Sequence, residues 1–250
     1  MTYLDPAGDG RVTVDLPIPG RALAIGAHPD DIDFGCGGAL AKWAAAGCAV
    51  TELVLTDGSK GSWDPNADRA GLIALRREEQ RAAAAALGAG EVVFLDHVDG
   101  ELASGLAERE EVCRVVRGAR PDVVLGHDPW KRYRLHPDHR HAGLLAVEGI
   151  VAARDPHFFP EQGLAPHRPS GLLLWEADEV DHVEAIDGFL AAKVAALLAH
   201  RSQWESTMGI DRDPSAEEQI FEERIRQRAA DAGALAGLPL AEPFKRIDRL

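Results

Sequence analysis

Short apolar runs alternate with longer amphipathic segments along most of this chain. Strands are predicted at 22–27, 49–55, 92–96, 122–126 and 171–176, with a further strand near 180–186. Helices are predicted at 38–47, 69–87, 106–118, 138–153, 187–203 and 215–232. This alternation is typical of a mostly parallel sheet that carries helices on both faces. We therefore predict an α/β fold of the doubly wound, Rossmann-like type.

The chain has 250 residues, which allows one large domain with a sizeable buried core. It contains no internal repeat, linker or long low-complexity segment. We expect a single domain over 1–250, with an N-terminal extension at 1–20. Residues 187–250 are expected to form a C-terminal elaboration of helices and strand.

The first polar cluster is His28-Pro29-Asp30-Asp31, directly after the apolar run 22–27. Ligands bind at the carboxyl ends of strands in open α/β sheets, so this position favours a functional site. In a tight turn the first and fourth residues can point at one ion. The carboxylate of Asp30 then stands beside the ion without binding it. The simpler alternative is that Asp30 and Asp31 only cap the following helix.

The second cluster is His136-Pro137-Asp138-His139, at the start of an amphipathic segment. Pro137 suits the first turn of a helix, and His136 suits its N-cap. His136 and His139 are then one turn apart on the same face. One of them can bind a metal while the other faces a substrate, although His136 could also act only as a cap.

Together the two clusters contain what metal-assisted hydrolysis requires. Catalytic zinc usually has three histidine or carboxylate ligands, and His28, Asp31 and His139 fit these roles. A nearby carboxylate can accept a proton from water, which suits Asp30. A second histidine can stabilise the oxyanion or protonate the leaving group, and His136 suits this role.

These motifs resemble the PIG-L/LmbE family of zinc-dependent de-N-acetylases, which act on N-acetylglucosamine-type substrates. The resemblance also covers weaker matches between about 20 and 245. They include the stretches 55–61, 76–80, 99–102, 120–124, 200–203 and 242–244. The fold that the resemblance implies agrees with the one predicted from the alternation of elements.

The resemblance implies roles for further residues. His28, Asp31 and His139 would bind zinc, Asp30 would be the general base, and His136 would act on the tetrahedral intermediate. From the resemblance alone, Asp138 would orient a histidine. On the same basis, Arg76 and Asp99 would contact sugar hydroxyls.

Two positions depart from common members of that family. Ile32 follows the two aspartates where many members have Glu, and Asp33 comes next. Arg134 stands two residues before His136, where some mycothiol-pathway members have Tyr. The second departure argues against that particular substrate.

Several other residues compete for a place in the site. His127 follows a predicted strand and could reach it, while His200 ends a predicted helix, where a cation favours the helix dipole. Trp63, Trp130 and Trp175 could line a sugar cleft, although ordinary packing is the stronger expectation for Trp175. Cys36 lies near the site, and we expect it to be packing filler rather than a nucleophile.

Charge and cysteine content narrow the class of protein. The net charge is −14, which argues against nucleic acid or an anionic membrane as partner. Cys36, Cys48 and Cys113 make no paired framework, which is typical of reduced thiols in the cytoplasm. The first twenty residues lack the features of a signal peptide, and no apolar run is long enough to span a membrane. A cytoplasmic protein is therefore expected.

The resulting prediction is a zinc-dependent deacetylase for an N-acetyl amino sugar or its conjugate. Fe²⁺, Co²⁺ or Ni²⁺ could replace Zn²⁺ at a site of this composition. One alternative is an amidase for a thiol conjugate that uses the same residues. A different class is a non-catalytic metal-binding assembly protein, although a closed structural site needs neither Asp30 nor His136. A homo-oligomer is expected from an exposed-looking apolar set at Phe158, Phe159 and Trp204. The sequence does not identify the aglycone.

Overall fold

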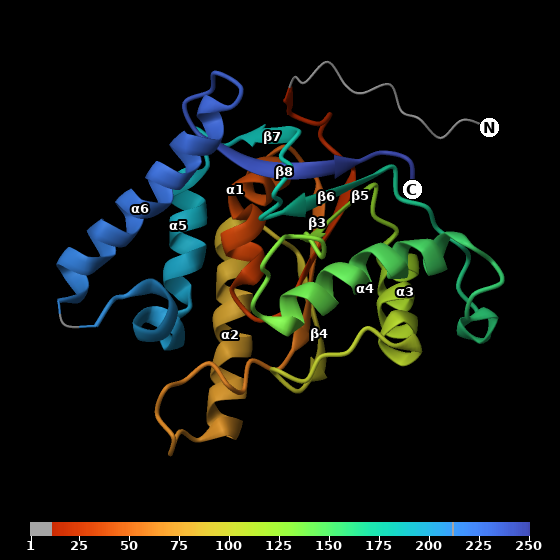
Figure 1. Ribbon diagram of the computed structural model, residues 1–250, viewed down its shortest axis with the longest axis horizontal. Helices are drawn as coiled ribbons and strands as arrows, with labels where there is room; N and C mark the ends of the chain where they lie inside the picture. Colours follow the sequence, from red (N-terminus) through yellow and green to blue (C-terminus); the bar gives the residue numbers. More distant parts are fainter. Residues whose placement is uncertain (1–11, 212) are drawn as a thin grey trace.

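The computed structural model describes residues 12–211 and 213–250. Within them, eight strands form one sheet in the order β1-β7-β8-β6-β5-β2-β3-β4 (Figure 1). The strands are β1 (Thr13–Val14), β2 (Arg21–Gly26), β3 (Ala49–Thr56), β4 (Glu91–His97), β5 (Val123–His127), β6 (Gly171–Trp175), β7 (His182–Ala185) and β8 (Ala241–Ile247). Only β8 runs antiparallel to its neighbours β6 and β7. The doubly wound, mostly parallel sheet is thus confirmed.

The helices cover both faces of the sheet (Figure 1). One apolar cluster packs the sheet against α1 (Asp31–Ala45), α2 (Arg69–Leu87) and α5 (Leu190–Ala199). A second cluster packs the other face against α3 (Leu106–Ala119) and α4 (Pro137–Arg154). A third, smaller cluster joins α5 to α6 (Pro214–Ala234). The described residues also form three short helical segments: the 3₁₀ helices η1 (Pro160–Gln162) and η2 (Arg201–Gln203) and the π-helix η3 (Trp204–Met208).

Helix α1 begins seven residues earlier than the predicted helix 38–47. The glycine-rich stretch 35–38 disfavours a helix by propensity, but here it lies inside one and is kinked at Cys36. A Cβ atom on Gly35 would lie 2.5 Å from the Trp175 ring, and one on Gly38 would lie 2.8 Å from Ile186. The glycines therefore let α1 pack directly on the sheet. The Cys36 thiol is fully buried there, as expected for a packing residue.

Two further expectations need correction. The predicted helix 187–203 is not continuous, since α5 ends at Ala199 and the chain continues through η2 and η3. The strand β8 was not predicted as a range, although a C-terminal strand was expected. The N-terminal extension lies partly outside the described residues, and its described part contributes β1, which pairs with β7.

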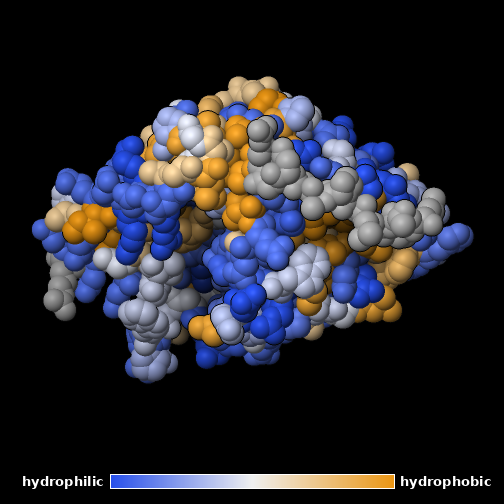
Figure 2. Space-filling view, turned by 45° about the horizontal axis from the view of Figure 1, so that its top comes forward, coloured by the Kyte–Doolittle hydropathy of each residue, from blue (hydrophilic) through white to orange (hydrophobic). Residues whose placement is uncertain are grey.

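The apolar set that was expected to mark a subunit contact is not a patch. Phe158 and Phe159 are half-buried against the α3–α4 cluster, whereas Trp204 is half-buried against the α5–α6 cluster. Figure 2 shows hydrophilic residues over most of one face, with hydrophobic residues in smaller groups between them. The homo-oligomer therefore stays a prediction, and these three residues no longer support it. In the described part of the chain, no helix has both the length and the apolar composition to cross a bilayer.

Candidate active site

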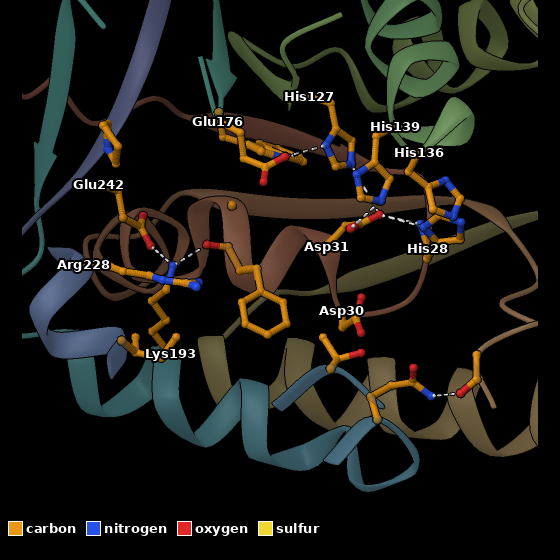
Figure 3. A pocket seen from close by; sticks show the side chains of 18 of the residues that line it. His28, Asp30, Asp31, His127, His136, His139, Glu176, Lys193, Arg228 and Glu242 are labelled. Carbon is orange, nitrogen blue, oxygen red and sulfur yellow. Dashed lines mark hydrogen bonds and ion pairs between the residues drawn. The ribbon is translucent and has the colours of Figure 1, made fainter. Parts of the chain in front are cut away.

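The two predicted clusters meet at the carboxyl edge of the parallel strands. His28 follows β2, and Asp31 is the first residue of α1. His136 is the N-cap of α4, and His139 lies in its first turn. Because β2 and β5 are neighbours, the segments after them are brought side by side. Figure 3 shows these side chains converging on one cavity.

His28 is held on both sides by carboxylates. Its Nδ1 lies 3.2 Å from Asp31 Oδ2. Its Nε2 lies 3.1 Å from Asp138 Oδ2 and 3.2 Å from Asp99 Oδ1. Burial alone would lower the pKa of His28, but the hydrogen bonds with Asp138, Asp31 and Asp99 raise that pKa well above its usual value. The surroundings of this ring thus attract a cation.

Asp138 is itself tightly fixed. It is fully buried, and its carboxylate accepts hydrogen bonds from the backbone N–H groups of Gly100 (2.6 Å) and Leu102 (3.3 Å). These bonds orient the carboxylate toward His28 Nε2, which leaves Nδ1 of His28 facing Asp31. Asp138 is thus placed to orient His28, and this role stays a prediction of the resemblance.

Asp31 is the centre of the cluster. Its Oδ1 lies 3.3 Å from His139 Nε2, and its Oδ2 lies 3.3 Å from His127 Nε2. Although burial opposes ionisation, His139 and His127 hold the pKa of Asp31 well below its usual value. Burial lowers the pKa of His139 to about 4, so that ring is neutral near pH 7. A neutral imidazole beside an ionised carboxylate is the state in which both can bind a metal.

The spacing of these atoms fits a metal ion. Donor atoms that share a tetrahedral zinc ion at about 2.0–2.2 Å lie roughly 3.3–3.6 Å apart. His28 Nδ1 and His139 Nε2 lie 3.2 Å and 3.3 Å from the carboxylate oxygens of Asp31. Three overlapping groups of described residues have ligand atoms within 4.8 Å of one another. These groups are His28–His136–His139, Asp31–His127–His139 and His28–Asp99–Asp138.

Asp30 lies beside this cluster in an unusual backbone conformation. Its φ of 100° is positive, which is rare for a residue with a side chain and is typical of functional sites. Its carboxylate is buried and lies 3.5 Å from Arg76 Nη2. Burial raises the pKa of Asp30 to about 6, while Arg76 acts in the opposite direction. The group can therefore gain and lose a proton near neutral pH.

His136 is the most exposed member of the cluster. Its ring centroid lies 4.6 Å from that of His28 and 4.8 Å from that of His139. Burial and the neighbouring His28 lower the pKa of His136. It is exposed and also lines the cavity, so its ring is accessible to a bound molecule.

Arg76 and Asp99 both line the cavity. Arg76 donates from Nη1 to Gly58 O (3.0 Å) and from Nη2 to Pro29 O (2.6 Å). Asp99 contacts His28 and accepts from the backbone N–H of Lys60 at 2.9 Å. Both side chains are thus within reach of a ligand but are also tied to the protein.

His127, which the sequence left as a competitor, is fully inside the cluster. Trp175 Nε1 donates to His127 Nδ1 at 3.0 Å, and Glu176 lies 3.6 Å from the same nitrogen. Glu176 also pairs with Arg134, whose Nη2 donates to Asp128 O at 3.1 Å. His127 ends β5, the position that made it a competitor in the sequence, and Glu176 directly follows β6, so the same strand-end rule could also have found Glu176. Trp175 is buried, whereas Trp63 and Trp130 are largely exposed.

The cavity has a volume of about 750 Å³ and extends well beyond the histidines. A second arm runs toward α5, α6 and β8, with walls that include Phe34, Ile186 and Ile225. Lys193 and Glu242 form an ion pair in this arm at 2.5 Å, and the side chain of Arg228 extends from α6 beside it (Figure 3). Glu242 lies in the stretch 242–244 that carries part of the family resemblance, but the sequence assigned no role to it, to Lys193 or to Arg228. Their placement in the cavity depends on how the C-terminal third packs.

The fold and the site together define a doubly wound α/β protein with a histidine–carboxylate cluster of metal-binding type. Residues 23–150 match the PIG-L family, described as GlcNAc-PI de-N-acetylase. The chain belongs to the PIG-L family.

Matches to named relatives cover most of the chain. A diacetylchitobiose deacetylase of Thermococcus kodakarensis is 33% identical over 230 residues, which cover 91% of this chain and 83% of that protein. A 1D-myo-inositol 2-acetamido-2-deoxy-alpha-D-glucopyranoside deacetylase of Streptomyces avermitilis is 34% identical, with 76% and 85% covered. The solved structure of N,N'-diacetylchitobiose deacetylase from Pyrococcus horikoshii superposes with a TM-score of 0.83 at 29% identity. That match covers 92% of this chain and 84% of the other.

Proposed function

We propose that this protein is a metal-dependent deacetylase that hydrolyses the acetamide of an N-acetylglucosamine-type sugar or glycoconjugate. The family match and both deacetylase relatives support this class of substrate. The observation that carries the proposal is the convergence of His28, Asp31 and His139 beside the separate carboxylate of Asp30 in one cavity. A purely structural metal site would have no use for that extra carboxylate.

His28, Asp31 and His139 would hold the metal, with Zn²⁺ as the expected ion and Fe²⁺, Co²⁺ or Ni²⁺ as substitutes. When bound, such an ion lowers the pKa of water and polarises a carbonyl group. Asp138, through its contact with His28 Nε2, would keep Nδ1 of that ring directed at the ion. His127 would instead hold the carboxylate of Asp31.

The protein's own groups would move the protons. Asp30, with a pKa of about 6, would take the proton of the attacking water, because a base is most effective when its pKa lies near the working pH. His136 would donate a hydrogen bond to the oxygen that becomes negative, or a proton to the departing amine. Its place on the open side of the cluster supports this role.

Arg76 and Asp99 are proposed to contact the sugar hydroxyls, since both line the cavity next to the cluster. The second arm, with apolar walls and the Arg228 guanidinium, is proposed to receive the rest of the substrate. A cavity of this volume is in the range that binds molecules larger than one sugar ring. Asp99→Ala should then lower kcat/KM on N-acetylglucosaminides more than on a minimal acetamide.

The test is release of acetate from a panel of N-acetylglucosaminides, with and without chelator, by the purified protein. We expect activity that chelation abolishes and divalent metal restores. The Asp30→Asn variant should keep its metal while kcat falls by roughly 10²–10⁴-fold. Amide cleavage confined to thiol conjugates would favour the amidase alternative. Full metal occupancy without cleavage of any amide would favour a metal-binding assembly protein.

A further inference from the structure

Four polar side chains lie fully buried behind the candidate base, on the side away from the cavity. They are Asp33 on α1, Glu52 on β3, Gln80 on α2 and His200 just after α5, and each has a relative exposure of 0%. Gln80 Nε2 donates to Asp33 Oδ2 (3.1 Å) and to Glu52 Oε2 (2.9 Å). His200 Nε2 lies 2.9 Å from the same Asp33 oxygen. None of the four lines the cavity, and the proposed chemistry uses none of them.

Gln80 connects this group to the active site. Its Oε1 accepts the backbone N–H of Asp30 at 2.8 Å. The orientation of the amide is fixed, because a flipped amide would place Oε1 against the Asp33 carboxylate and NH₂ against the backbone N–H of Asp30. Asp33 and Glu52 thus determine that the oxygen of Gln80 points at Asp30, and His200 holds Asp33 in turn.

The backbone of Asp30 needs such support. A φ of 100° is strained for any residue with a Cβ atom, and it persists only where the surroundings impose it. The neighbouring peptide group is also held, since Arg76 donates to Pro29 O at 2.6 Å. A relaxed φ would turn the Asp30 carboxylate to a different direction while leaving Asp31, one residue later, in its helix.

We propose that Gln80 is a positioning residue that holds Asp30 in its strained backbone conformation and so aims the catalytic base at the substrate. Asp33, Glu52 and His200 orient Gln80 for this purpose. The inference rests on the proposed function, since it assigns the supported carboxylate a role in proton transfer. Buried polar groups of this kind are a poor source of stability compared with hydrophobic side chains of similar volume, which favours a positional role.

A double-mutant cycle on the metal-loaded enzyme tests the proposal. Gln80→Met should lower kcat by roughly 10–100-fold, because small misplacements of a reacting group cost about that much. KM should stay within about twofold, and the metal content should not change. In the Asp30→Asn background the same substitution should cause no further loss. Gln162→Met is the matched control, because it removes a half-buried glutamine that accepts from Arg117 Nη1 at 3.2 Å and does not line the cavity. It should leave kcat unchanged.

A merely structural role would reduce activity by the same factor in both backgrounds, and that result would overturn the proposal. An unchanged kcat in Gln80→Met would do so as well. If Gln80→Met does not fold, the double variant Gln80→Met/Glu52→Gln takes its place, because it also removes one of the two buried acids that Gln80 contacts. The Asp30 N–H still lacks its acceptor there, so the same outcomes apply.

Hydrogen exchange of the Asp30 amide gives a readout that needs no activity. We expect this amide to be protected in the wild type and in Gln162→Met, and to exchange rapidly in the Gln80→Met variants. Equal protection in all of them would overturn the proposal. If the wild type releases no acetate from any sugar, the proposed function fails, whereas the exchange experiment still decides whether Gln80 holds Asp30.

Discussion

Trp175 determines which nitrogen of His127 carries a proton. The indole N–H donates to Nδ1 at 3.0 Å, so Nδ1 must offer its lone pair and the proton lies on Nε2. Nε2 lies 3.3 Å from Asp31 Oδ2, close enough for a charge interaction but without the alignment of a hydrogen bond. A ring nitrogen that carries a proton cannot bind a metal. His127 is thereby expected to support Asp31, although it belongs to one of the groups with metal-binding spacing.

The two histidines should therefore respond differently to substitution. His139→Ala should lose stoichiometric metal and activity. His127→Asn should keep the ion and lower its affinity by roughly 10–100-fold, as expected for a residue that only orients a ligand. Elemental analysis after dialysis against buffers of graded free metal measures both. If His139→Ala keeps its full metal content while His127→Asn binds no metal, then His127 is the metal ligand and His139 the supporting residue.

Glu52 is expected to make stability depend on pH. Burial and the nearby Asp33 raise the pKa of Glu52 well above its usual value. A carboxyl with a raised pKa in the folded state binds more protons when folded, so its contribution to stability is complete at low pH. That contribution is lost as the pH rises from the pKa of Glu52 in the unfolded state through its pKa in the folded state.

Glu52→Gln should remove this loss, since an amide stays neutral at every pH. We expect the variant to gain stability relative to wild type as the pH rises from about 5 to 8, and to gain little at pH 4. Urea unfolding at a series of pH values measures the difference. Parallel stability curves for the two proteins would mean that Glu52 does not titrate between these limits.

The sequence predicted the residues of the cluster better than their surroundings. His28, Asp31, His136 and His139 come together because parallel strands end at one edge of the sheet, which is visible in the sequence as apolar runs that stop at polar clusters. The orienting network of Gln80 could not be predicted in this way. Its members are far apart in the chain and become neighbours only through packing of α2 and α5 against the sheet.

Among the elements, the departures from prediction have tertiary causes. Helix α1 includes the stretch 35–38 because glycine there allows close contact with Trp175 and Ile186, which outweighs poor helix propensity. The predicted helix 187–203 ends early, where the His200 side chain binds Asp33. Strand β8 contains Pro243, which is unusual for a strand with partners on both sides and obscured the pattern.

The loop after α4 is held by a single buried arginine. Arg117 on α3 is 4% exposed and donates to the carbonyl oxygens of five residues at the end of α4 and in the following turn. These residues are Ala152, Ala153, Asp155, Phe158 and Phe159. This anchoring explains why Phe158 and Phe159 pack inward.

Arg117→Met should therefore destabilise the fold by roughly 3 kcal/mol, because it removes a buried, charged donor that joins five carbonyl groups of this loop. Arg114→Met on the same helix is the matched control, since Arg114 is exposed and its ion pair among the described residues is with Glu110. We expect it to change stability by less than about 0.5 kcal/mol. Denaturant unfolding measures both, and equal effects would contradict the anchoring role.

At the scale of the whole molecule, metal binding should contribute measurably to stability. The cavity gathers Asp30, Asp31 and Asp99 in a protein whose net charge is already −14. Zinc at 100 times its Kd should stabilise the chelator-treated protein by about 2.7 kcal/mol. For a chain of this size that corresponds to a rise in Tm of roughly 5–10 °C.

Thermal unfolding of the chelated protein, with and without added zinc, measures this shift. The His139→Ala variant serves as the control and should show no zinc-dependent rise. An equal rise in that variant would locate the stabilising ion elsewhere on the molecule.

The position of β8 has a consequence for how the protein is made. This strand follows β6 and β7 in the chain, yet it lies between them in the sheet, and in the described residues β1 pairs with β7 alone. The carboxylate of Glu242 in β8 also accepts hydrogen bonds from the backbone N–H groups of Gly38 and Ala39 in α1. Until β8 has been synthesised and has left the ribosomal exit tunnel, neither β7 nor the arm of the cavity near Glu242 can reach its final place. The binding cavity is therefore completed only when a late segment of the chain inserts between two strands that were made before it.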